Sequence, residues 1–139
     1  MENNKKVVLE LLSEEYSVYK FGINHQMNKN IFDNEFVSIT KTNDELSIVA
    51  ISGLLNQFEK KEDNWKVLKI IGILDFSLIG IISTISSILA NNGISIFVIS
   101  TYNTDYIMVK VEKITKTIEI LKKNNFEIKN NIFEDKSYN

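Results

Sequence analysis

Hydrophobic periodicity changes along the second half of the chain, and each change predicts a different element. Residues 65–71 are rich in β-branched side chains and predict a strand that ends at Gly72. Over residues 78–92 apolar positions recur at helical spacing, with serines and threonines largely on the other side, so we expect an amphipathic helix. Ser77 is placed to cap the start of this helix, and Gly93 is placed to close its end.

The rest of this half continues the pattern. Residues 94–100 are nearly continuous in apolar side chains, which predicts a strand covered on both faces, and residues 106–111 predict the next strand. A second amphipathic helix is expected over residues 113–124, with a closing strand at residues 126–128. This order of elements predicts an α+β fold of the ferredoxin-like βαββαβ kind, with an antiparallel four-stranded sheet and both helices on one face.

The first half contains short apolar stretches separated by polar turns. Residues 7–12 and 16–21 predict two strands joined as a hairpin. Residues 36–40 and 46–51 predict a second pair of strands around a polar turn. Residues 22–34 are rich in asparagine and predict a loop with at most a short helix.

A charge run at residues 59–63 predicts a solvated connector between the halves. The length of 139 residues fits one or two small domains. We therefore expect a smaller N-terminal module over residues 1–62, the ferredoxin-like module over residues 63–132 and a frayed polar tail over residues 133–139.

Composition narrows the choice of partners. The 16 basic and 18 acidic residues give a net charge of −2 with both signs scattered, which is not the pattern of a nucleic-acid or membrane surface. Absence of cysteine excludes disulfides, zinc fingers and iron–sulfur clusters. The polar N-terminus does not resemble a signal peptide, and Lys69 and Asp75 interrupt the only long apolar stretch. We expect a cytoplasmic protein.

Several segments resemble ACT domains. Residues 93–101 resemble the second strand of the regulatory ACT domains of aspartate kinases. Residues 75–80 together with residues 100–106 are similar to small bacterial proteins with tandem ACT modules, which are related to the CASTOR family of arginine sensors. The first half, including residues 42–47, fits the degenerate N-terminal ACT-like module of those proteins. The resemblance implies a regulatory domain that binds an amino acid where two ACT modules meet.

The candidate ligand site lies in the loop before the first helix and at the start of the following strand. Free N–H groups at a helix N-terminus attract a carboxylate. Asp75 could neutralise the ammonium group of a bound amino acid, or could instead cap the loop. Aspartate kinases usually have Asn-Ile where this chain has Ser95-Ile96, and that dipeptide contacts ligand largely through its backbone. The predicted ligand-binding residues are Leu74, Asp75, Phe76, Ser77, Leu78, Ser95 and Ile96.

Other polar residues favour structural roles. Ser100, Thr101, Asn103 and Asp105 form a polar cluster at a strand end, and this composition is more typical of a turn than of a binding site. His25 has no second histidine or carboxylate near it in sequence. Because the sequence also lacks a phosphate-binding glycine loop, a nucleophile elbow and metal-ligand spacing, we expect no catalysis, no cofactor and no metal.

Two functions remain open at this point. The first is a non-enzymatic sensor in which a small ligand, an amino acid, stabilises one arrangement of the ACT modules or subunits. The second is a structural or protein-interaction ACT module without a ligand, which the serine at position 95 keeps open. In either case the apolar strand at residues 94–99 needs cover on the face that its helices leave bare. We expect a homodimer to provide it; the alternative is that the N-terminal half covers this face within one chain.

Overall fold

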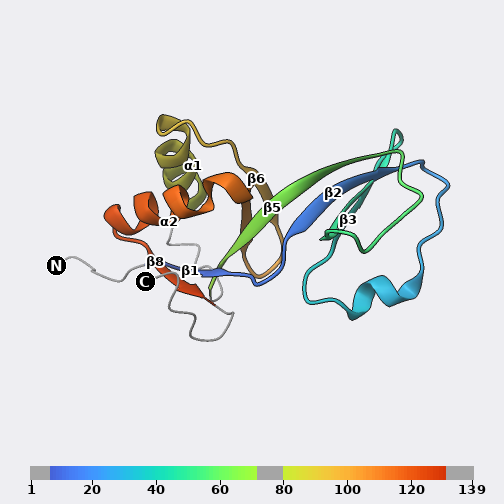
Figure 1. The fold of residues 1–139 in the computed structure, drawn as a ribbon, viewed down its shortest axis with the longest axis horizontal. Coiled ribbons are helices and arrows are strands. Elements are labelled where there is room, and N and C mark those ends of the chain that lie inside the picture. Colours follow the sequence, from blue (N-terminus) through green and yellow to red (C-terminus); the bar gives the residue numbers. More distant parts are fainter. Residues whose placement is uncertain (1–6, 72–79, 131–139) are drawn as a thin grey trace. The chain divides into compact units, whose positions relative to one another are not determined.

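The computed structural model describes residues 7–71 and 80–130. The chain divides into two compact units, one formed by residues 1–13 with 66–139 and the other by residues 14–65 (Figure 1). The two modules expected from the sequence, residues 1–62 and 63–132, stay a prediction. The structure nevertheless assigns the first strand of the chain to the same unit as both helices.

The unit of residues 1–13 and 66–139 is a sheet with two helices. Among the described residues its strands follow the order β8-β1-β5-β7-β6. β1 is antiparallel to β5, with Leu9 opposite Ile70, and parallel to β8, with Leu9 opposite Ile128. The elements are β1 (Val8–Leu11), β5 (Lys60–Ile70, its second half), α1 (Ile81–Asn91), β6 (Phe97–Ser100), β7 (Asp105–Lys110), η2 (Val111–Lys113), α2 (Ile114–Lys123) and β8 (Glu127–Asn130).

Both helices pack on one face of this sheet, as predicted (Figure 1). Alternate residues of each strand point to that face, because side chains in a strand alternate between its two sides. They form one core with the apolar stripes of α1 and α2, and its buried members include Leu9, Leu11, Leu68, Ile70, Ile85, Leu89, Ile107, Val109, Ile118 and Leu121. The predicted α+β, ferredoxin-like class is therefore confirmed.

Both helices end where the sequence predicts. At the end of α1, Gly93 has φ +73°, its N–H donates to Ala90 and the N–H of Ile94 donates to Leu89, both over 2.9–3.0 Å. This is a Schellman motif. α2 ends in the same way with Asn125 at φ +72°. The predicted closing role of Gly93 is confirmed.

The start of α1 differs from the prediction. The helix begins at Ile81, and Gly80 takes the N-cap position with φ +85° and no side-chain cap. Ser77, the predicted cap, lies outside the described residues. The following strand is also shorter than predicted, because the backbone N–H of Ile94 closes the helix and β6 starts only at Phe97.

The predicted hairpin between residues 7–12 and 16–21 is wrong. β1 pairs with β5 and β8, whereas β2 (Tyr16–Phe21) pairs with β4 and β5. Both segments are strands, but the alternation that predicts a strand does not identify its partner. The predicted four-stranded antiparallel sheet is corrected accordingly, because β1 joins it as an additional strand parallel to β8.

The unit of residues 14–65 is an antiparallel sheet in the order β3-β4-β2-β5, with β5 contributing its first half. It contains β3 (Ser38–Lys41), β4 (Leu46–Ile51) and a 3-10 helix, η1 (Lys29–Asp33). The predicted β3–β4 hairpin is confirmed, with the Thr42 N–H donating to Glu45 over 2.9 Å. The predicted loop with a short helix is also confirmed by η1. Buried Tyr19, Phe21 and Ile48 belong to its core.

The charge run at residues 59–63 is not a free connector. Lys60 to Glu62 lie in β5 and pair with β2. A strand at the surface can hydrogen-bond through its backbone while its charged side chains face water, so charge alone did not identify a loop here.

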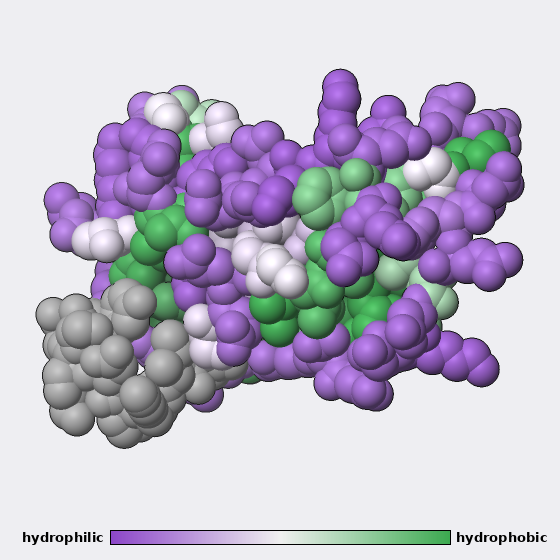
Figure 2. Space-filling view, turned by 45° about the vertical axis from the view of Figure 1, so that its right-hand side comes forward, coloured by the Kyte–Doolittle hydropathy of each residue, from purple (hydrophilic) through white to green (hydrophobic). Residues whose placement is uncertain are grey.

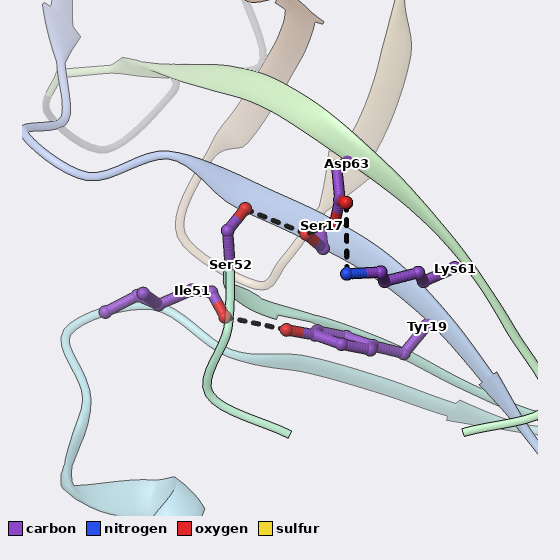
Figure 3. Close-up of polar contacts among 6 residues, drawn as sticks. All are labelled: Ser17, Tyr19, Ile51, Ser52, Lys61 and Asp63. Carbon is purple, nitrogen blue, oxygen red and sulfur yellow. Dashed lines mark hydrogen bonds and ion pairs between the residues drawn. The ribbon is translucent and has the colours of Figure 1, made fainter. Parts of the chain in front are cut away.

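A chain of hydroxyl and carboxylate groups crosses this sheet where β5 bulges (Figure 3). The register between β2 and β5 shifts so that Asp63 and Asn64 together oppose Ser17. The buried Ser17 hydroxyl donates to the carboxylate of Asp63. The oxygen of the Ser52 hydroxyl lies 2.8 Å from the oxygen of the Ser17 hydroxyl. Since Ser17 has one proton, Ser52 must donate to it. Asp63 also pairs with Lys61 at 3.1 Å.

Within the described ranges, no helix has the length and apolar character to cross a membrane. Hydrophilic residues cover most of the face drawn in Figure 2, with smaller hydrophobic patches among them. Single exposed apolar residues are ordinary on protein surfaces.

We predict that Gly93→Ala destabilises the protein by about 1–2 kcal/mol, the cost of a left-handed residue with a Cβ. The cost is conformational, because an added Cβ would meet nothing within 4 Å. Asn125→Gly should stabilise the protein, because glycine adopts the left-handed conformation freely. Urea denaturation measures both changes. Equal stability of Gly93→Ala and the wild type would contradict the assigned helix end.

We predict that Ser17→Ala lowers the free energy of unfolding by about 1.5 kcal/mol, the lower end of the range for a hydrogen bond to a charged group. The lower end applies because the Asp63 side chain is 36% exposed and water can partly replace the lost donor. Ser52→Ala is the matched control and should cost less, since it removes a bond between two neutral groups. Denaturation of both variants tests this, and a larger loss for Ser52→Ala would contradict the arrangement in Figure 3.

Candidate functional site

The candidate ligand site has two parts, of which the structure describes one. Leu74, Asp75, Phe76, Ser77 and Leu78 lie outside the described residues. Ser95 and Ile96 are described, and they occupy the short stretch between the end of α1 and the start of β6. The predicted assignment of these residues to a ligand therefore stays a prediction.

Ser95 is held in place by its neighbours and is open to solvent. Ile94 is buried in the core and its N–H closes α1, while Ile96 is partly buried against the same core. Ser95 between them is exposed. Its backbone and hydroxyl can therefore meet a ligand at the start of β6 without disturbing the core.

β6 lies at an edge of the sheet. Among the described strands it pairs with β7 alone, with Phe97 opposite Met108 and Ser100 opposite Asp105. An edge strand has one side on which its backbone N–H and C=O groups can pair with a further strand. Phe97 and Ile99 are half-buried, on the opposite side of β6 from Ile96 and Val98, which contact the core.

The other part of the site begins where β5 ends. The N–H of Ile71 donates to Val8 over 2.8 Å, which fixes the end of β5 against β1. The hydroxyl of Thr104, which is buried, donates to the carbonyl of Ile70 over 2.7 Å. The described chain resumes at Gly80, at the start of α1. Ile71 and Gly80 are thus the described residues on either side of residues 72–79.

The end of β5 and the start of β6 lie at opposite ends of the sheet. Thr104 sets the start of β7 beside the end of β5, so these strands run antiparallel. β6 is antiparallel to β7, so β5 and β6 run in the same direction. Ser95, before the start of β6, is thus at the other end from Ile71, and β6 alone spans about 13 Å.

The polar cluster at residues 100–105 is a turn, as favoured from the sequence. The Thr101 N–H donates to the carbonyl of Thr104 over 2.8 Å, and the Thr101 hydroxyl donates to the same carbonyl over 3.0 Å. The contact of Thr104 does not follow from the sequence, because its partner is a carbonyl 34 residues earlier in the chain. No local pattern indicates such a contact.

His25 has a packing role in the structure. Its ring stacks on Phe21, with 4.2 Å between ring centroids. Within the described residues, no group of three or more potential metal ligands is present.

Family models match both units of the chain. The model of the ACT domain matches residues 60–123, and a model of an N-terminal domain matches residues 14–53. The residues that match the ACT-domain model contain β5, α1, β6, β7 and α2. The second match falls inside the unit of residues 14–65. None of the curated proteins matches the sequence.

Solved structures share the fold. A crystal structure of a protein from Agobacterium tumefaciens is 28% identical with a TM-score of 0.84, and the match covers 94% of this chain and 98% of that one. A Vibrio cholerae protein of unknown function, described as a possible transport protein, is 20% identical with a TM-score of 0.66, over 86% and 91% of the two chains.

The regulatory subunit of aspartate kinase from Thermus thermophilus, in its ligand-free form, is also similar. Its identity is 9% and its TM-score 0.57, over 83% of this chain and 95% of that one. At these low identities the Vibrio and Thermus structures show a common fold alone. The fold of this chain is thus the one found in the regulatory ACT domains of aspartokinases.

Proposed function

We propose that this protein is a non-enzymatic regulatory sensor that binds an amino acid where ACT modules meet. The ACT domain and its regulatory neighbours indicate a regulatory, ligand-binding role. The observation that carries the proposal further is the exposed Ser95 beside an edge strand of that domain. We also propose a cytoplasmic location, with which the absence of cysteine is compatible.

In this proposal two copies of the chain form a homodimer through β6. Pairing of the β6 edges would satisfy their backbone groups and place cross-strand neighbours beside the half-buried side chains of Phe97 and Ile99. It would also bring Ser95 and Ile96 of one copy toward the other copy's residues 74–78. The opposite placement of Ile71 and Ser95 within one copy supports such a shared site.

The ligand would be held through both of its charges. Its carboxylate would face the backbone N–H groups around Ser77 and Leu78, and its ammonium group would lie near Asp75. Ser95 and Ile96 would meet its backbone atoms. Ligand binding then stabilises the dimer because only the dimer offers the complete site.

We further propose that residues 14–65 are a degenerate ACT-type module, so that the chain is a tandem-ACT protein akin to the CASTOR arginine sensors. The separate family match at residues 14–53 supports two distinct modules. The match of the ACT-domain model to residues 60–123 supports an ACT fold for the second module.

The second candidate function is a protein-interaction module without a ligand. It is favoured by Ser95 itself, since serine lacks the side-chain amide that aspartate kinases usually have at this position. An exposed β6 edge could then serve only for pairing with another chain.

We predict that titration calorimetry detects a common amino acid binding to the wild type, and that Asp75→Ala weakens this binding by about 1.5–3 kcal/mol. That range is the usual contribution of a hydrogen bond to a charged group. Asp44→Ala, in the exposed β3–β4 turn, is the matched control and should bind as the wild type does.

Absence of binding by every common amino acid at millimolar concentration would favour the interaction module. Equal affinity of Asp75→Ala and the wild type would remove the role given to Asp75. Sedimentation in the same solutions tests the shared site, because ligand should raise the dimer fraction. A 16.0 kDa monomer that binds ligand fully would contradict a site shared between copies.

A further inference from the structure

A hollow of about 230 Å³ lies on the sheet of the 14–65 unit, away from the candidate ligand site. Its lining comes from three neighbouring strands and the turn before β4: Val18, Tyr19, Lys20, Glu45, Ser47, Lys60, Lys61 and Glu62. A space of this size suits a small molecule or a chemical group rather than a large ligand.

Strand register aligns hydrogen-bond donors across this hollow. Lys20 of β2 is directly opposite Ser47 of β4 on one side and Lys60 of β5 on the other. Directly opposite residues share one face of a sheet, with Cβ atoms about 4.5–5.5 Å apart. Two ammonium groups and a hydroxyl can therefore reach the same point, beside the apolar side chain of Val18.

The two lysines are poorly compensated. Like charges directly opposite each other in a sheet are destabilising. In the part of the chain that the structure describes, Lys61 is paired with Asp63, but neither Lys20 nor Lys60 has a carboxylate within 4.0 Å. Glu45 and Glu62 line the hollow and lower its positive potential, so weak and selective binding is expected rather than strong binding of any anion.

We propose that this hollow binds the oxyanion group of a small molecule, a carboxylate or a phosphate, between Lys20 and Lys60, with the Ser47 hydroxyl as a third donor. The anion relieves the repulsion between the two lysines and accepts charge-assisted hydrogen bonds from both. This site is independent of the amino-acid site proposed above and uses no residue of it.

The test uses the full chain with inorganic phosphate and with succinate, at an ionic strength kept constant with sodium chloride. The wild type should melt at a higher temperature as either anion is added, with saturation. Without phosphate or succinate, at low ionic strength, Lys60→Gln should melt above the wild type, and most of its rise on adding either anion should be lost. Lys41→Gln, an exposed lysine on β3 outside the hollow, should retain the full rise.

A response to phosphate alone would assign a phosphate group, and a response to succinate alone would assign a carboxylate. Amide NMR of the wild type gives a readout without substitutions, with the largest shifts expected at Lys20, Ser47 and Lys60. The proposal is overturned if neither anion acts, if Lys60→Gln and Lys41→Gln respond alike, or if the amide shifts lie outside the hollow.

Discussion

β1 completes the hydrophobic core of the helix-bearing unit by lying between β5 and β8. Leu9 and Leu11 are 0% and 1% exposed, and they contact the same core as both helices. Burial of such side chains stabilises a fold by about 1.5–3 kcal/mol each. Without β1, both β5 and β8 would also lose a hydrogen-bonded neighbour. The unit that contains both helices therefore includes a strand from the N-terminal end of the sequence.

β1 does not pair with β6, the edge strand that follows Ser95. β1 enters on the side of β5 that faces away from β7 and β6. The edge that carries Ser95 thus remains the outer edge of the sheet, and the β6–β7 turn still reaches the end of β5 through Thr104. β1 thus lies on one side of β5, and β7 and β6 lie on the other side. β1 also holds the end of β5, because the N–H of Ile71 donates to the carbonyl of Val8. A change that weakens β1 should therefore act both on overall stability and on the position of the end of β5.

Local rules predicted the elements well and the long-range pairings poorly. Both helices, their common face and the role of Gly93 followed from periodicity and from the backbone freedom of glycine. The partners of β1 did not follow, because Leu9 and Leu11 fit a hairpin as well as a distant sheet. The charged residues at the start of β5 were predicted to form a connector, but their backbone pairs with β2. In the candidate site, the sequence indicated Ser95 but not Thr104, whose partner is distant in the chain.

Complementation between fragments tests the role of β1 most directly. A fragment of residues 66–139 should show little cooperative unfolding by circular dichroism, because its core lacks Leu9 and Leu11. Adding a peptide of residues 1–13 should bind it and restore a cooperative transition, whereas the same peptide with L9S and L11S should not. If the fragment alone unfolds cooperatively at the temperature of the full chain and ignores the peptide, β1 is not the strand on which this unit depends.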